Sequence, residues 1–180
     1  MPFGRRLLLG MEEIRRARDA DAPAIASLIT HLGYPTTAEQ MRRRLRRIST
    51  DQNYVSLVAA ERDYVLGFLG LTFGLYYERD GFYGRIIALS VAPEARMRGV
   101  GTKLLTAAEE IASSRGAIDC IVNSGLQRAP AHRFYEARGF SWQAKAFYKP
   151  LRSFLSAPPR PLARRDLHGA SNCGSCDERG

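Results

Sequence analysis

The sequence has few cysteines and no long hydrophobic run. Three cysteines among 180 residues are too few for a disulfide framework, which favours a reducing compartment. No apolar stretch approaches the roughly 20 residues that a membrane-spanning helix needs. The "LLL" near the start is too short for the apolar core of a signal peptide. We therefore expect a cytoplasmic protein with no membrane partner.

The cysteines themselves suggest no redox or metal chemistry. Cys173 and Cys176 form "CGSC" near the end of the chain, shortly after His168. A redox CxxC motif needs a helix N-terminus in a packed fold, and a structural zinc site needs four ligands. Neither is evident, so we expect no metal. Cys120 lies in an apolar segment, where a thiol behaves as a small hydrophobic side chain.

Acidic residues are outnumbered by basic ones. There are 18 Asp and Glu against 27 Lys and Arg, which gives a net charge of +9, and only three of the basic residues are lysines. Such a balance can indicate nucleic-acid binding. The arginines are scattered, and no basic stripe is interleaved with aromatic residues, so we interpret them as a solvated surface and expect no nucleic-acid partner. Arg43, Arg46 and Arg47 also leave open an acidic acceptor molecule.

The length and the composition predict one domain with two flanking segments. Residues 12–152 hold the periodic apolar patterns, and residues 1–11 read as an N-terminal extension, with Met11 as an alternative start. Residues 153–180 are rich in Pro, Ser, Gly and Arg without periodicity, so we expect a disordered tail.

The hydrophobic patterns predict a mixed sheet with helices on both faces, in the α/β (α+β) class. The first helix has Asp19 or Asp21 as its N-cap, and the second begins with a capping box of Thr36 and Glu39. A strand, a helix and a second strand in the middle of the chain predict a right-handed parallel crossover in a mostly antiparallel sheet. Predicted strands cover residues 12–18, 54–61, 64–77, 82–92 and 117–124, with a closing hairpin at 140–144 and 147–151, and predicted helices cover residues 22–32, 36–49, 102–115 and 130–138.

The segment "RMRGVG", residues 96–101, has the residue pattern that most clearly indicates a binding site. It joins a strand that ends at Pro93 to a long helix. Helix N-termini hold unsatisfied N–H groups and a partial positive charge, which suit phosphate oxygens. Gly99 and Gly101 let the backbone approach an anion, and Arg96 and Arg98 add charge-assisted contacts. The pattern predicts a phosphate-binding turn.

Two other nucleotide motifs fit this turn poorly. A Walker A loop needs GxxxxGK[ST], and "GVGTK" has neither the spacing nor the order. A dinucleotide-binding GxGxxG would place Leu104 at its third glycine, and Asp119 opens the next strand instead of ending it. A pyrophosphate held by an Arg-x-x-Gly-x-Gly turn fits best.

Two motifs resemble one family. "VAPEARMRGVGTKLL" resembles motif A of the GNAT family of acyl-CoA-dependent N-acetyltransferases, and "NSGLQRAPAHRFYEARGF" is similar to that family's second motif. Both occur in the family's order and separation. The resemblance implies the GNAT fold over residues 12–152, acetyl-CoA as co-substrate, and acetyl transfer to a primary amine of a small molecule or protein. A homodimer is left open.

The resemblance also implies roles for single residues. Tyr135 would face the CoA sulfur and assist the leaving thiolate, and Asn123 would bond to the pantetheine arm near the thioester. The strand residues implied to offer backbone groups to that arm are Leu89, Ser90 and Val91. The residues implied to cradle the pyrophosphate are Arg96, Met97, Arg98, Gly99, Val100, Gly101 and Thr102.

The general base is missing from the pattern. Many family members carry a carboxylate on the fourth strand, where this sequence has Ile87 and Ala88. His31 and His132 are conceivable replacements, as is a water chain, and we assign no base. The gap leaves an alternative from another class, a non-catalytic acyl-CoA-binding or regulatory module.

Overall fold

The computed structural model describes residues 12–143 and 146–149. The chain divides into two compact units, Met1–Ala146 and Phe147–Gly180, and the architecture below belongs to the first. The predicted extension 1–11 and tail 153–180 lie outside the described residues, as do Cys173 and Cys176.

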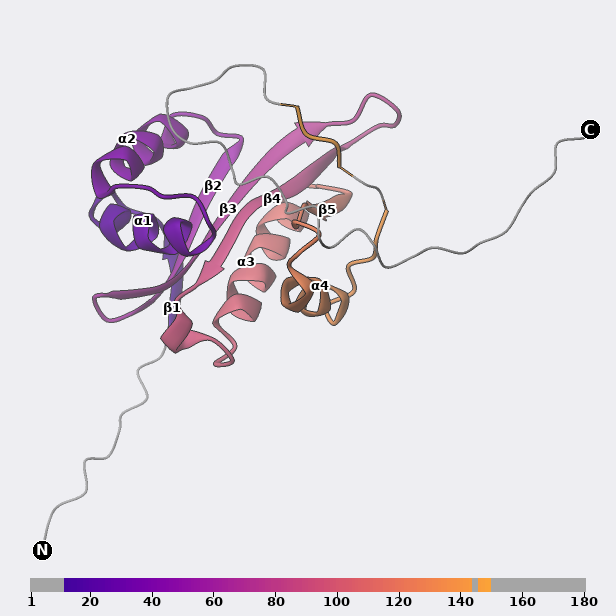
Figure 1. Ribbon diagram of the computed structural model, residues 1–180. Coiled ribbons are helices and arrows are strands. Elements are labelled where there is room, and N and C mark those ends of the chain that lie inside the picture. The colour runs from indigo at the N-terminus through magenta and orange to yellow at the C-terminus, as the bar shows by residue number, and fades with distance from the viewer. Residues whose placement is uncertain (1–11, 144–145, 150–180) are drawn as a thin grey trace, which may run out of the picture. The chain divides into compact units, whose positions relative to one another are not determined.

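Over residues 12–143, nine helices and strands follow one another in the order expected from the sequence (Figure 1). Two short 3-10 turns, Asp19–Asp21 and Pro93–Ala95, precede α1 and the 96–102 segment. The elements are β1 (Glu13–Arg16), α1 (Ala22–His31), α2 (Ala38–Ser49), β2 (Tyr54–Glu61), β3 (Tyr64–Leu75), β4 (Phe82–Val91), α3 (Val100–Ser114), β5 (Asp119–Val122) and α4 (Ala129–Glu136).

The described sheet is mixed and has the strand order β1-β2-β3-β4-β5. Neighbouring strands from β1 to β4 are antiparallel, whereas β4 and β5 are parallel and are joined through α3. A parallel pair needs such a crossover because a short turn cannot reverse the chain twice. The predicted fold class and its central strand–helix–strand unit are confirmed.

Helices cover both faces of the sheet, with α1 and α2 on one side and α3 and α4 on the other (Figure 1). On the α3 face, Gly67 leaves no room for a Cβ beside Leu104, at 2.9 Å, so the helix lies close against β3. On the α1 face, the Ser90 hydroxyl donates to the Leu28 carbonyl across 2.8 Å. The core is aliphatic, and Leu104 and Leu69 are fully buried in it.

Of three local predictions, two are wrong and one holds in position only. The capping box of α2 uses Thr37 and Gln40, one residue later than predicted: the Thr37 N–H donates to Gln40 Oε1 across 2.9 Å, and the Gln40 N–H donates to Thr37 Oγ1 across 3.2 Å. The Thr36 hydroxyl instead donates to the carbonyl of Tyr34, two residues earlier in the chain. At α1, Asp21 occupies the N-cap position, as one of the two predicted alternatives, and its carboxylate binds Arg15 instead of the helix N–H groups.

The third concerns the end of the sheet. Residues 140–143 and 146–149 form no strand, and the other residues of the predicted closing hairpin lie outside the described part. β5 is therefore the last strand of the described sheet, and all four of its residues are half-buried. Both faces of β5 are therefore only partly covered by the described chain.

Candidate functional site

Residues 96–102, which we call the glycine turn, lead from the end of β4 into α3. Met97 and Gly99 have φ values of +61° and +83°. Two left-handed residues so close together reverse the chain within a few residues. No acceptor of good geometry meets the backbone N–H groups of residues 97–102 within the described chain, and the first paired amide is that of Lys103, which bonds to the Gly99 carbonyl. The turn therefore presents a row of free N–H donors at the N-terminus of a 15-residue helix.

The two arginines of the turn do different things. Arg98 donates from Nη2 to Glu61 at 3.0 Å and to Glu12 at 3.3 Å. The expected contact of the Arg98 side chain with a phosphate stays a prediction, and a phosphate there would compete with two carboxylates for the guanidinium. Arg96 is exposed and has no carboxylate partner in the described chain, and its Nε lies 3.4 Å from the Val91 carbonyl.

The two glycines also differ. The space beside the Cα of Gly99 is open, and its left-handed φ is the reason for glycine there. A Cβ on Gly101 would lie 3.5 Å from the Phe134 ring, which is ordinary van der Waals contact. Gly101 therefore faces α4, and the space beside it would accept a methyl group. Phe134 is half-buried against the core.

Arg138 is a residue of this region that the sequence reasoning missed. Its guanidinium donates to Thr102 Oγ1 and lies 4.1 Å from the centre of the Phe134 ring. It thus ties the end of α4 to the glycine turn and adds a cation beside the free N–H groups. The only sequence signal was its position just before the Gly-Phe that ends the second motif.

Strands β4 and β5 separate beside this turn. Their last paired rung is Ile86–Val122, and β4 carries a bulge at the next residue, Ile87, where its register with β3 shifts. Beyond that point the described sheet has no strand along this edge of β4. Leu89 and Val91 are half-buried there, and Ser90 is buried. The roles expected of these three residues toward a pantetheine arm stay predictions.

Tyr135 is held in an aromatic cluster on α4. Its ring centre lies 5.3 Å from that of Phe134 and 5.7 Å from that of Phe140, both edge-on. Burial raises the pKa of its hydroxyl above the ordinary value of 10.0, the positive charge of Arg128 opposes that rise, and Cys120 adds to it. The hydroxyl is therefore neutral at physiological pH and can donate a hydrogen bond.

Asn123, the first residue after β5, has a partner that the sequence did not predict. Its Oδ1 accepts from Arg85 Nε at 3.1 Å and from Nη2 at 2.7 Å. The side-chain oxygen is thus occupied, while the amide group remains a donor.

No carboxylate replaces the missing base on β4. Ile87 is half-exposed, at 51%, and Ala88 is apolar. His31 is exposed at the end of α1, and His132 bonds through Nε2 to the Gly125 carbonyl at 2.9 Å. Neither histidine gains a carboxylate partner in the described chain.

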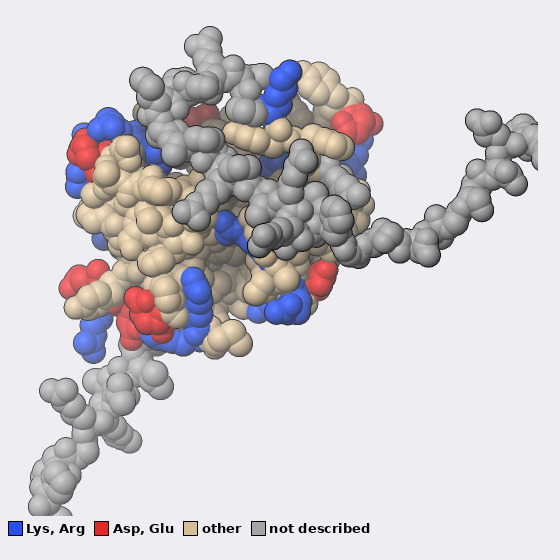
Figure 2. Space-filling view, in the orientation of Figure 1, with Lys and Arg blue, Asp and Glu red and all other residues tan. Residues whose placement is uncertain are grey.

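Basic and acidic side chains are intermixed on the face shown in Figure 2. On α2, Arg43 pairs with Glu39, and Arg46 pairs with Asp19 at 2.8 Å. Two of the arginines that left open an acidic acceptor therefore have carboxylate partners within the fold, and both carboxylates are shared with Arg42.

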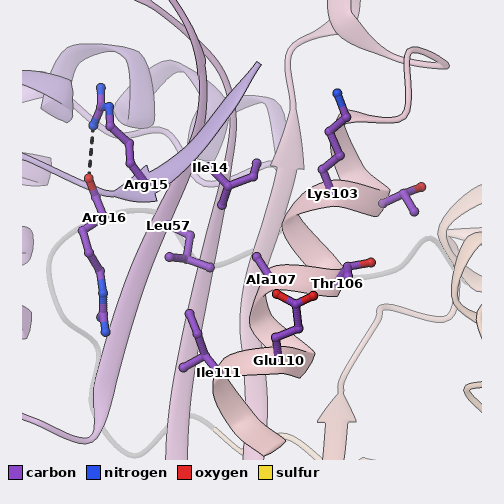
Figure 3. A pocket seen from close by; sticks show the side chains of 10 residues that line it. Ile14, Arg15, Arg16, Leu57, Lys103, Thr106, Ala107, Glu110 and Ile111 are labelled. Atoms are coloured by element: carbon purple, nitrogen blue, oxygen red, sulfur yellow. Dashed lines mark hydrogen bonds between the residues drawn. The ribbon is translucent and has the colours of Figure 1, made fainter. Parts of the chain in front are cut away.

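A groove of about 610 Å³ lies between β1 and α3. Ile14, Leu57, Ala107 and Ile111 point into it, and Lys103 stands at one end (Figure 3). It lies on the β1 side of α3 and shares Thr102 with the glycine turn, whereas Tyr135 is on α4.

Cys120 has no reactive character. Burial, and then the charge of Glu109, raises the pKa of its thiol to about 11. The residues that the structure describes contain no group of three metal-binding side chains. They also contain no helix of the length and apolarity that crossing a bilayer requires.

Comparisons with known proteins agree with this geometry. Residues 11–140 match the model of the acetyltransferase (GNAT) family. The aminoalkylphosphonate N-acetyltransferase of Salmonella typhimurium is 28% identical over 144 residues, which are 77% of this chain and 91% of that protein.

Solved structures show the same fold. A GNAT family acetyltransferase from Staphylococcus aureus is 26% identical, with a TM-score of 0.67 over 78% of this chain and 98% of its own. An aminoglycoside N-acetyltransferase in complex with CoA has a TM-score of 0.70 at 16% identity, over 79% and 96% of the two chains. The chain belongs to the GNAT family of acetyltransferases and is an acyltransferase.

Proposed function

We propose that the protein transfers the acetyl group of acetyl-CoA to a primary amine, by direct attack in a ternary complex. The observation that carries this proposal is the row of free backbone N–H groups at residues 97–102. Beside them lies Arg96, which bonds to the Val91 carbonyl and has no carboxylate partner in the described chain. Such a row at a helix N-terminus suits the paired phosphates of a nucleotide. The name of the Salmonella typhimurium relative supports an amine acceptor.

The reaction needs little chemistry from the chain. The amine nitrogen bonds to the thioester carbon, the C–S bond breaks, and the sulfur leaves with the electron pair. A backbone N–H along the unpaired edge of β4 would stabilise the oxyanion that forms between these events. The proton lost by the amine passes to water, because β4 carries Ile87 and Ala88 where a carboxylate base would stand.

Tyr135 would assist the leaving group. Its raised pKa keeps the hydroxyl protonated, and a thiol of pKa about 8.5 is a stronger acid than a phenol of about 10. Complete proton transfer to the sulfur is therefore not required of it. A hydrogen bond from the neutral hydroxyl already lowers the energy of the developing thiolate.

Release of free thiol from acetyl-CoA across an amine panel tests the proposal. We expect turnover with wild-type protein and a loss of kcat on the order of tenfold or more in Tyr135→Phe, with the KM for acetyl-CoA little changed. Phe134→Leu is the matched control, because it alters the same cluster without removing a hydroxyl. Full turnover by Tyr135→Phe when chemistry limits the rate would remove Tyr135 from the mechanism.

The missing β4 carboxylate favours a second candidate, a module that binds acyl-CoA without transferring the acyl group. Calorimetry with CoA separates the two. Tight binding with no thiol release for any amine would favour the second candidate, and no binding at all would contradict both.

A further inference from the structure

Arg85 is an oriented cation without a counter-charge in the described chain. Its guanidinium is fixed by two hydrogen bonds to Asn123 Oδ1, at 3.1 and 2.7 Å. That oxygen belongs to an uncharged amide. No Asp or Glu of residues 12–143 or 146–149 forms an ion pair with Arg85. The positive charge is therefore oriented but not neutralised.

The position of Arg85 on β4 places it on the face opposite α3. A Cβ on Gly84 would lie 3.0 Å from Ala112 of α3, so Gly84 faces that helix. Successive residues of a strand point to opposite faces, and Arg85 thus faces the side that α1 and α2 cover in part. It lies one residue before Ile86, the last residue of β4 that pairs with β5.

This location is where an acceptor would approach. The proposed thioester site lies where β4 and β5 separate, with the glycine turn and Tyr135 of α4 on the α3 side. An amine that attacks through this opening comes from the opposite face. On that face β4 offers Arg85 and the half-exposed Ile87. The nearest carboxylate of β5, Asp119, already accepts from Tyr76 at 2.7 Å and pairs with Arg79.

We propose that the acceptor is a small primary amine that also carries an acidic group, and that Arg85 binds this acidic group. The inference rests on the proposed acetyl transfer and adds the substrate class. Arg85 uses two of its N–H groups to bond to Asn123. Its remaining N–H donors, on Nη1 and Nη2, can form paired hydrogen bonds to a carboxylate or a phosphonate. Asn123 is then a positioning residue for the guanidinium.

Four amines of similar length test the class: propylamine, putrescine, β-alanine and aminoethylphosphonate. We expect kcat/KM for each of the two acid-bearing amines to exceed that for propylamine by about tenfold or more, since a charge-assisted pair contributes about 1.5–3 kcal/mol. The two acidic amines distinguish a carboxylate from a phosphonate site. Equal rates for all four amines would overturn the inference and leave the acetyltransferase proposal standing.

Two variants test Arg85 itself. Arg85→Gln should lower kcat/KM for the acidic amines about tenfold and leave that for propylamine and the KM for acetyl-CoA within about twofold. Asn123→Asp keeps the Arg85 guanidinium but places a carboxylate beside it. The positive charge is then neutralised, so kcat/KM for the same two acidic amines should fall. Arg115→Gln is the control, because Arg115 is an exposed arginine that bonds to the Gln52 carbonyl elsewhere. Thermal melting of each variant verifies folding.

A binding readout keeps the inference separate from catalysis. If no amine is acetylated, the proposed function fails, and calorimetry of aminoethylphosphonate and β-alanine with the CoA-saturated protein decides on Arg85. Binding that Arg85→Gln abolishes supports an acid-binding site. Absence of binding of both compounds, or binding unchanged in Arg85→Gln, overturns it.

Discussion

Arg98 Nη2 lies 3.0 Å from Glu61 Oε2, which joins the glycine turn to the end of β2. The same nitrogen reaches Glu12, whose side chain is only 6% exposed and also binds Lys103 Nζ at 2.7 Å. Arg98 therefore anchors the turn, and Arg96 is the arginine of the predicted anion site that we expect to contact a ligand. We therefore expect substitutions at Arg96 and at Arg98 to have different effects.

Arg96→Ala should raise the Kd for CoA by about tenfold, because it removes a charge-assisted contact to phosphate. Arg98→Ala should change that Kd by less than about threefold and instead lower the melting temperature, since its loss releases the turn from Glu12 and Glu61. Calorimetry and thermal melting measure the two effects. A larger loss of CoA affinity in Arg98→Ala than in Arg96→Ala would contradict the assignment.

Alanine should be tolerated differently at the two glycines of the turn. Gly99→Ala forces a left-handed φ on a residue with a Cβ, at a cost of about 1 kcal/mol, and should lower the melting temperature by about 3 °C and weaken CoA binding. Gly101→Ala meets Phe134 at an ordinary contact distance and improves helix propensity, so it should melt at the wild-type temperature or above. The reverse order of stability would show that the turn is built differently.

Asp21 should carry an acid-sensitive part of the stability. Its carboxylate is 7% exposed and accepts from both Arg15 Nη atoms at 2.7 and 2.9 Å. The hydrogen bond from Arg15 chiefly lowers the pKa of Asp21, burial opposes that change, and the Arg18 N–H adds to it. A lowered pKa in the folded state stabilises the fold above the unfolded-state pKa of about 4, and this stability is lost as the pH falls through the folded-state value.

Asp21→Asn should therefore lower the free energy of unfolding by about 2–3 kcal/mol at neutral pH, because it leaves Arg15 without its counter-charge. The difference from wild type should shrink as the pH falls below about 4. Urea denaturation across pH measures both. Asp19→Asn is the control, because the exposed Asp19–Arg46 pair should contribute no measurable stability.

Cys120 should resist alkylation. In a Cys173→Ser/Cys176→Ser variant it is the sole cysteine, and a thiol pKa of about 11 leaves on the order of one thiolate per thousand at pH 8. We expect iodoacetamide to react on the order of a hundredfold more slowly than with a free cysteine at pH 8. The rate should rise up to about pH 11. Rapid labelling at pH 8 in folded protein would contradict burial of the thiol.

The geometry of the glycine turn was largely predictable because its parts are contiguous. A strand, two glycines and a helix start lie within one short segment, and local backbone preferences place the free N–H groups of residues 97–102. The capping box shows the limit of the same reasoning. Both Thr36 and Thr37 satisfy the pattern, and packing of α2 through Met41 and Leu45 selects the second.

The partners of the charged residues could not be predicted, because they join segments far apart in the chain. Glu12 and Lys103 are separated by 91 residues, and Arg85 and Asn123 by 38. Some arginines pair with a carboxylate and others have no counter-charge beside them. Which of the two applies depends on how the strands pair and on where each side chain points. Neither has a local signal.

The order of strands and helices and the glycine turn thus follow from the sequence alone, since hydrophobic periodicity and short-range backbone chemistry encode them. The family was indicated by the resemblance of two sequence motifs, and the family model confirms it. The tertiary structure decided which charges are neutralised and where the uncompensated ones stand. The physical reason is that a Coulomb interaction depends on distance in space, and only the folded sheet brings Glu61 to Arg98 and leaves Arg85 beside a neutral amide.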